Sequence, residues 1–374
     1  MRRFAFASAL TLAPCAPAAL TAQAGTDGPY KVLKRARVGG EGGTDYIYAD
    51  VVGRRLYIPR GGQRGMPATD STPARAATAG RITIFNLETL EPLGEIPETG
   101  GNGVAVDPKS GHGFSSSRPP SMFDTKTMTA MKKIPTDSGV VPDGIYFDSF
   151  NDRVYVFSHP TKDATVIDSH DGTVLGRIDL GGTPEQAIGD GKGTLYVVMQ
   201  ERPAGGVAVV DVKTMKTTAH YPFGDVGGCN GLALDAKNHV LFAACGNSGN
   251  PPANPAQPTM VIMNADNGTI LAKLPLAGGS DGAVFNPATM EAFSSHSNGT
   301  LTVVKEKSPT SFEVEQNLQT MNGARTLTLD NKTGHIFVMA SEVGPAPPPP
   351  PGGGRGRGGA PIPGSFTILM IGQQ

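Results

Sequence analysis

The sequence has 374 residues, with 50 glycines, 32 prolines and no tryptophan. Its 32 Lys and Arg residues nearly balance 33 Asp and Glu residues, which gives a formal net charge of −1. This balance excludes a general attraction to nucleic acid or anionic lipid. Abundant turn-forming residues with little periodic helix signal indicate an all-β chain.

The first 24 residues have the pattern of a secretory signal peptide. Two arginines precede a short apolar run, and Ala-Gln-Ala at 22–24 forms a cleavage site of small residues. We therefore expect cleavage after Ala24 and a periplasmic or extracellular protein. No later apolar run is long enough to span a bilayer.

The remaining chain, 25–374, repeats one pattern seven times. Each copy has an apolar strand, a turn opened by Asp or Asn, and further β-rich runs that make four short strands in all. The turn residues are Asp50, Asp107, Asp148, Asp190, Asp235, Asn286 and Asp330. Neighbouring turn residues are 41 to 57 positions apart, and a period of this size with four strands per copy is typical of β-propellers. We predict a single seven-bladed β-propeller domain.

The seventh copy lacks a fourth strand after its last run, SFTILMIG at 365–372. The run YKVLKRARVG at 30–39 can supply it, so we expect an N-terminal strand to complete the last blade and close the ring. A closed ring leaves no sheet edge open to another chain, which favours a monomer.

Two cysteines of the mature chain fall in the fifth copy. Antiparallel pairing around the turn at 235–240 places Cys229 almost opposite Cys245. Such pairing brings Cα atoms to about 4.5–5.5 Å, a separation that a disulfide can bridge. We expect a Cys229–Cys245 disulfide in an exported protein; the alternative is two buried thiols.

An aromatic residue recurs in the second strand of every copy, as in LYIPR, VYVFS, LYVVM and IFVMA. In this pattern the chain resembles the YVTN-repeat, YncE-like family of seven-bladed, WD40-like propellers, which are extracytoplasmic proteins of bacteria and archaea. The resemblance implies a fold and a compartment. Because that family has no single shared reaction, function must be argued from the site.

Two sets of acidic and amide residues are expected to be structural, because Asp and Asn bond the backbone of their own turns. The first set is the seven turn residues above. The second opens the turns between third and fourth strands: Asn86, Asp124, Asp168, Asp211 and Asn264.

Another set of residues stands five positions before each turn, where the innermost strand of each blade begins. It consists of Asp45, Asn102, Asp143, Glu185, Asn230, Asp281 and Arg325. We expect these seven to form a ring at one mouth of the central channel. The loops between second and third strands reach the same face and add His159 and His296. Converging carboxylates there require raised pKa values, a cation, or pairing with Arg325.

Three interpretations of this ring stay open. In the first, Asp-Gly and Asn-Gly pairs merely suit the tight entry into the inner strand. In the second, the mouth is an acidic funnel that binds a small molecule or an exported polymer or protein. In the third, Asp45, Asp143, Glu185 and Asp281 hold a divalent cation, as in a metal-dependent, lactonase-like hydrolase. No other cofactor is indicated.

Long Pro/Gly-rich loops at 60–81, 246–258 and 343–364 border this mouth, and such tracts form no core. Their arginines are Arg60, Arg64, Arg75, Arg81, Arg355 and Arg357. Acidic and basic groups together suit a zwitterionic or polymeric partner. Arg-Gly pairs also occur in single-strand nucleic-acid binders, but aromatics make up only 6% of the chain, so stacking platforms are scarce and this alternative is the weakest.

Standard catalytic motifs are missing: the sequence has no His-Glu-x-x-His, no Gly-x-Ser-x-Gly and no phosphate loop. We therefore predict an exported propeller that acts as a binding scaffold through the mouth, with the hydrolase as the alternative.

Overall fold

The computed structural model describes residues 27–63, 65, 67–68, 74, 76–202, 204–246, 257–346 and 359–374. The predicted signal peptide at 1–24 lies outside these residues, as do four of the loop arginines: Arg64, Arg75, Arg355 and Arg357.

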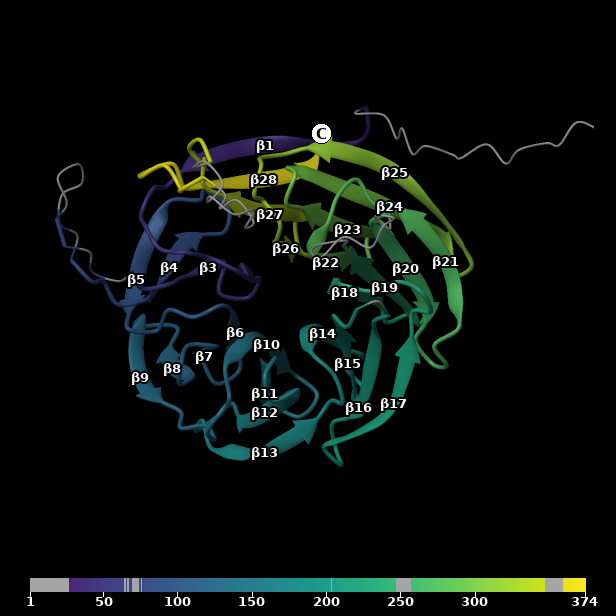
Figure 1. Cartoon of the computed structure of the whole chain (residues 1–374), viewed down its shortest axis with the longest axis horizontal. Helices are drawn as coiled ribbons and strands as arrows, with labels where there is room; N and C mark the ends of the chain where they lie inside the picture. The colour runs from purple at the N-terminus through teal and green to yellow at the C-terminus, as the bar shows by residue number, and fades with distance from the viewer. Residues whose placement is uncertain are drawn as a thin grey trace, which may run out of the picture.

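Over the described residues the chain forms 28 β-strands, which pair into seven four-stranded antiparallel sheets. The sheets stand around a central axis like the blades of a propeller (Figure 1). This confirms the predicted seven-bladed, all-β architecture. No helix in the described part of the chain is long and apolar enough to cross a membrane.

In each blade the first strand lies innermost and the last outermost (Figure 1). Blade one is β2 (Tyr48–Asp50), β3 (Arg55–Arg60), β4 (Arg81–Asn86) and β5 (Pro92–Pro97). Blade two is β6 (Val104–Asp107), β7 (His112–Ser115), β8 (Ser121–Asp124) and β9 (Thr129–Lys133). Blade three is β10 (Pro142–Asp148), β11 (Arg153–Ser158), β12 (Asp163–Asp168) and β13 (Val174–Asp179). Blade four is β14 (Pro184–Gly189), β15 (Thr194–Met199), β16 (Gly206–Asp211) and β17 (Lys216–Pro222).

The remaining blades follow the same order. Blade five is β18 (Cys229–Asp235), β19 (Val240–Cys245), β20 (Thr259–Asn264) and β21 (Ile270–Pro275). Blade six is β22 (Ser280–Asn286), β23 (Glu291–His296), β24 (Thr300–Ser308) and β25 (Ser311–Gln319). Blade seven is β26 (Leu327–Asp330), β27 (His335–Ala340), β28 (Thr367–Gln373) and β1 (Tyr30–Arg37).

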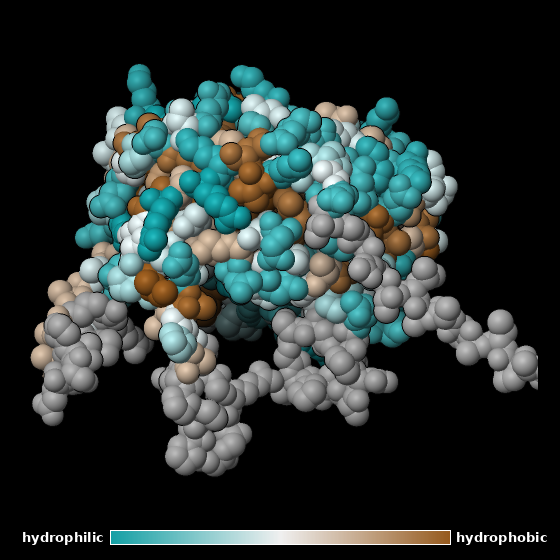
Figure 2. Space-filling view, turned by 90° about the horizontal axis from the view of Figure 1, so that it is seen from above, coloured by the Kyte–Doolittle hydropathy of each residue, from teal (hydrophilic) through white to brown (hydrophobic). Residues whose placement is uncertain are grey.

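The N-terminal strand closes the ring as predicted. Strand β1 pairs with β28 from Tyr30 opposite Gln373 to Arg37 opposite Thr367, and the two lie side by side at the top of Figure 1. Tyr30 is buried and packs edge-on against Phe293 of blade six, with ring centroids 5.0 Å apart. Figure 2 shows that the wall around β1 is mainly polar, with scattered apolar side chains, as expected for an outermost strand.

The repeated aromatic residues form the core between blades. All seven are buried: Tyr57, Phe114, Tyr155, Tyr196, Phe242, Phe293 and Phe337. They contact the neighbouring blade; Phe242, for example, stacks on Phe285 at 5.3 Å between ring centroids. Burying one such side chain stabilises the fold by about 1.5–3 kcal/mol, so the motif is explained by packing.

The turn residues are structural, as predicted. In all seven first turns, the side-chain oxygen accepts a hydrogen bond from a backbone N–H two or three residues later. The five third-to-fourth turns do the same. We call the end of the ring with these turns the turn face, and the opposite end, where the inner strands begin, the mouth face.

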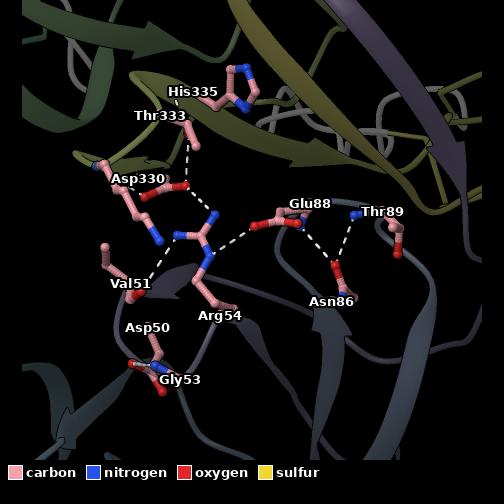
Figure 3. A network of polar contacts seen from close by, with 11 residues as sticks. Asp50, Val51, Gly53, Arg54, Asn86, Glu88, Thr89, Asp330, Thr333 and His335 are labelled. Atoms are coloured by element: carbon pink, nitrogen blue, oxygen red, sulfur yellow. Dashed lines mark hydrogen bonds and ion pairs between the residues drawn. The ribbon is translucent and has the colours of Figure 1, made fainter.

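An arginine joins blades one and seven at the turn face. Arg54 Nη2 lies 2.7 Å from Asp330 Oδ2 and Arg54 Nε lies 3.2 Å from Glu88 Oε1 (Figure 3). Asp330 also accepts a hydrogen bond from the Thr333 hydroxyl. The carboxylate is thus fully engaged by its own blade and its neighbour.

The two cysteines are register partners at the start of β18 and the end of β19, and they form a disulfide. Both are buried. The cystine joins the two innermost strands of blade five at the mouth face, which confirms the predicted pairing.

Candidate functional site at the channel mouth

Five of the predicted ring residues are joined by side-chain contacts at the mouth face. Arg325 lies between two carboxylates, 3.2 Å from Asp45 Oδ1 and 2.6 Å from Asp281 Oδ2. The Asn230 amide donates to Asp281 Oδ1 at 2.8 Å and to Glu185 Oε1 at 3.4 Å. Blades one, seven, six, five and four are therefore linked in sequence around the channel.

The other two blades continue this chain of contacts. The Asn102 amide donates to Asp143 Oδ1, and Asp143 Oδ2 lies 2.7 Å from Nε2 of His159. The same imidazole nitrogen lies 3.4 Å from Glu185 Oε1. His159 comes from the loop after β11, so a second-to-third strand loop does reach the ring in blade three.

Glu185 has the most perturbed carboxyl of the ring. It is 7% exposed, and burial, then the charge of Asp143, raise its pKa to about 8. The Tyr46 hydroxyl donates to its Oε2 at 3.0 Å from blade one. Glu185 is therefore protonated at neutral pH and can act as a weak acid or a hydrogen-bond donor.

The neighbouring pair of Asp143 and His159 differs from Glu185, because its pKa shifts favour the charged forms. Burial alone would raise the pKa of Asp143, but contacts with His159 and Asn102 lower it below its ordinary value. The contact with Asp143 outweighs burial and raises the pKa of His159. Both shifts favour the charged forms of the two groups.

Asp45 completes the charge balance of the ring. Burial raises its pKa to about 6, against the opposing effect of Arg325. The carboxyl groups of Asp45, Asp143 and Asp281 thus lie against two basic side chains, Arg325 and His159. The mouth carries both signs of charge around its rim and is less acidic than its four carboxyl groups alone would make it.

His296 is a correction to the predicted mouth. Its backbone pairs with Ser280 at the level of the ring, but its side chain is fully buried inside blade six. Nε2 lies 2.9 Å from the Thr302 hydroxyl, which donates to Asn317, and burial lowers the pKa of His296 to about 4. Successive side chains point to opposite faces of a strand. The His296 side chain points into the interior of blade six and not toward the channel.

Two further residues, which the ring pattern does not predict, reach across the channel between blades. Tyr46 crosses from blade one to Glu185. Gln186 accepts from the N–H groups of Leu232 and Ala283, each at 3.0 Å, and donates to the Ala283 carbonyl at 2.9 Å, which joins the inner strands of blades four, five and six.

A sequence signal for these two residues exists. The position after the ring residue is glycine in four copies (Gly103, Gly144, Gly231 and Gly282) but Tyr46 and Gln186 in blades one and four. A Cβ at Gly144 would lie 3.1 Å from the Glu185 carbonyl and 3.6 Å from the Tyr46 hydroxyl. The glycines leave space that the two larger side chains occupy.

The predicted four-carboxylate metal set is divided in the structure. Asp45 and Asp281 share Arg325, whereas potential ligand atoms of Asp143, His159 and Glu185 all lie within 4.8 Å of one another. One imidazole with two carboxylates is a donor set that suits a transition metal better than Ca²⁺.

The loop arginines within the described residues do not edge the mouth as free cations. Arg81 pairs with Glu95 at 2.9 Å, and Arg60 ends β3 and is buried. The expected basic border is therefore not formed by these two residues.

No protein-family model and no curated protein matches the sequence. Several solved structures have a similar fold. Hydrazine synthase of Kuenenia stuttgartiensis superposes with a TM-score of 0.63 at 13% identity, over 78% of this chain and 91% of that chain. A chain of the mitotic checkpoint complex gives 0.64 at 9% identity, over 90% and 95%. The Pan2 WD40 domain of Neurospora crassa gives 0.62 at 13% identity, over 93% and 96%. At these identities the likeness shows a WD40-like propeller fold alone.

Proposed function

We propose that this protein is an exported, YVTN-repeat-like propeller that acts as a binding scaffold, and that the ring at the mouth face is its site. The observation that carries the proposal is the convergence of side chains from all seven blades, with perturbed carboxyl groups among them. Shifted pKa values gather at functional sites, and ligands bind where polar groups converge in a concave place.

The charges around the ring favour a partner that carries both signs. Asp45 and Asp281 flank Arg325, and Asp143 lies against His159. A zwitterionic small molecule, or an exported polymer or protein segment with alternating charge, can match this order, whereas a simple anion or cation meets repulsion on one side.

Export has its own test. The disulfide fits an oxidising compartment, and we expect the secreted protein to begin at Gly25. N-terminal sequencing of protein collected from outside the cytoplasm measures this directly; an intact Met1 with two free thiols would contradict export.

The site is tested with paired variants. Zwitterionic amino acids, amino sugars and short peptides are titrated in thermal-shift and calorimetric assays. A ligand of the ring should lose most of its affinity in the Asp143→Asn/Asp281→Asn variant. It should bind unchanged to Asp124→Asn/Asp211→Asn, which removes two carboxylates from exposed turns of the turn face. Equal binding to both variants would show that the ring is not the site.

A second function is favoured by the cluster of Asp143, His159 and Glu185. These residues could hold a divalent transition metal, which in hydrolases lowers the pKa of a bound water. A metal that binds the native state at 100 times its dissociation constant stabilises it by about 2.7 kcal/mol. Metal analysis after chelator-free purification, with melting curves of wild type and His159→Asn, tests this; a wild-type melting temperature unmoved by chelator or added metal would contradict it.

A further inference from the structure

Arg60 is a buried cation that has no carboxylate partner among the residues that the structure describes. It is 2% exposed, and its guanidinium stacks on Phe366 with 3.8 Å from Cζ to the ring centroid. Nη2 donates to the Gly40 carbonyl at 3.0 Å. Within the described residues, Nε has no hydrogen-bond partner and the side chain has no ion pair. Arginine is rarely buried to this extent unless it is paired.

The surroundings of Arg60 are unfavourable to its charge. Burial, and then the nearby charge of Arg81, lower the pKa of Arg60 to about 10. Stacking on an aromatic ring and one carbonyl contact offset only part of the cost of removing a guanidinium from water. An anion supplied from outside the chain would complete this environment.

A cavity of about 410 Å³ opens beside Arg60, on the mouth-face side of the seam between blades one and seven. This volume is within the range of small-molecule sites. Its walls include Met339, Phe366 and two unusually exposed apolar residues, Val343 at 60% and Ile362 at 41% exposure. One side of the cavity is therefore apolar.

The other charged residues that line the cavity leave Arg60 uncompensated. Arg325 is paired with Asp45 at the inner end. Glu41 also lines the cavity, but its side chain is exposed and makes no ion pair with Arg60 in the described part of the chain. The Arg60 guanidinium, whose Nε–H has no partner among the described residues, is thus the main polar anchor.

We infer that this cavity binds a small amphipathic monoanion, a carboxylate on a short apolar body, with Arg60 as its counter-ion. The planar guanidinium matches the two oxygens of a carboxylate. Val343, Ile362 and Met339 would contact the apolar part. A single uncompensated cation favours one negative charge over the higher charge of phosphate. The inference rests on Arg60 and does not depend on the proposed function of the ring, although Asp45 and Arg325 line both the cavity and the ring.

The test uses a ligand series at constant ionic strength: acetate, butanoate, hexanoate, hexylamine and inorganic phosphate. Calorimetry should show that affinity increases from acetate to hexanoate by up to about fourfold per buried methylene, with no binding of hexylamine. Tighter binding of phosphate than of hexanoate would overturn the monoanion, and no binding of any carboxylate at tens of millimolar, roughly the lower limit for a useful site, would overturn the site.

Variants connect the binding to Arg60. Arg60→Met keeps much of the apolar stem and should weaken hexanoate at least about tenfold, the loss expected of one charge-assisted contact. Arg54→Gln removes an arginine from the opposite face of the same seam and should bind hexanoate like wild type. Unchanged binding by Arg60→Met would overturn the inference.

A second pair of variants covers the case in which Arg60→Met does not fold. Val343→Ser with Ile362→Ser changes only exposed positions and should weaken hexanoate while leaving acetate unchanged. Val52→Ser, at an exposed valine of the turn face, is the matched control. Asp143→Asn should not change hexanoate binding, so failure of the ring proposal and failure of this one are distinguishable. Equal hexanoate affinity in the Val343/Ile362 variant and in wild type would exclude the cavity.

Discussion

Blade one places an arginine at each end of its seam with blade seven, and the two arginines have opposite surroundings. At the turn face, Arg54 is paired with Asp330 and Glu88 (Figure 3). At the mouth face, Arg60 is more deeply buried, and its partners among the described residues are a carbonyl and an aromatic ring. Folding alone accounts for Arg54, because each charge there has a counter-charge. Arg60 has no counter-charge among the described residues, and we therefore interpret it as the anion-binding group of a ligand site.

Two carboxyl groups of each face differ in a comparable way, although burial raises the pKa values of Asp50 and Asp148 at the turn face and contacts lower that of Asp143 at the mouth face. At the turn face, hydrogen bonds overcome burial and lower the pKa values of Asp107 and Asp330. At the mouth face, burial prevails and raises those of Asp45 and Glu185. Asp107 and Asp330 therefore stabilise the fold in their charged form, whereas charge on these two mouth-face groups costs stability. Groups that cost stability are typical of functional sites.

The largest effect is expected from removing the strand that holds the seam together. Deletion of Tyr30–Val38 removes β1 and exposes the edge of β28. Loss of the buried Tyr30 side chain alone should cost about 3–5 kcal/mol. We expect aggregation or a large fall in melting temperature, measured by circular dichroism and light scattering. A truncated protein that melts like the full-length chain would contradict the ring closure.

A smaller loss is expected from breaking the turn-face pair. Arg54→Gln leaves Asp330, whose side chain is 1% exposed, without its guanidinium. Breaking a buried pair costs about 3–5 kcal/mol, and because Arg54 is itself 20% exposed we expect about 2 kcal/mol, at the low end for loss of one partner. Urea unfolding measures it. A change below about 0.5 kcal/mol, the usual range for surface substitutions, would show that the pair does not hold the seam.

Glu185 at the mouth face should make the free energy of unfolding depend on pH. In metal-free protein, the folded pKa of Glu185 is about 8, above the ordinary value of 4.5 that it takes in the unfolded chain. The stability that its proton contributes is therefore complete below about pH 4.5 and lost as the pH rises through about 8. Glu185→Gln should remove this loss and gain about 1–3 kcal/mol relative to wild type between pH 5 and pH 8.

Unfolding by urea at several pH values gives this difference directly, and subtraction of the variant from wild type cancels the titration of His296 and other groups. The raised pKa values of Asp45 and His159 act in the same direction. A difference between wild type and Glu185→Gln that does not change with pH would show that Glu185 is not held in its neutral form.

The ring could be predicted from sequence because seven copies share one register. Once the turn residues were aligned, the position five residues earlier had to open each inner strand, and the observed contacts join those residues. The pairings within the ring could not be predicted. They depend on side-chain reach across the channel, as when Arg325 spans Asp45 and Asp281.

Two residues show where pattern alone fails. His296 has the predicted register, but a shift in the pairing between Ser280 and Gly282 and the alternation of the strand determine where its ring points. Arg60 directly precedes a Gly-rich loop, so its sequence predicts a loop arginine, whereas it ends β3 and is covered by Phe366, which lies 306 positions later in the chain. A contact of that kind has no local signature.

The most direct test of the difference between the two faces compares two double variants that each remove two carboxylates. Asp107→Asn/Asp330→Asn places amide N–H groups against donors from Ser169 and Arg54. Asp143→Asn/Asp281→Asn loses the pairs with His159 and Arg325 but relieves the repulsion that Asp143 exerts on Asp45 and Glu185.

The free energy of unfolding of both variants is measured by urea at pH 7 in the presence of chelator. We expect the turn-face variant to lose about 3 kcal/mol or more, because it leaves buried donors without acceptors. The mouth-face variant should stay within about 1 kcal/mol of wild type, the worth of partly exposed pairs. A mouth-face variant that loses as much stability as the turn-face variant would mean that the ring exists to hold the fold together, and would contradict its assignment as a binding site.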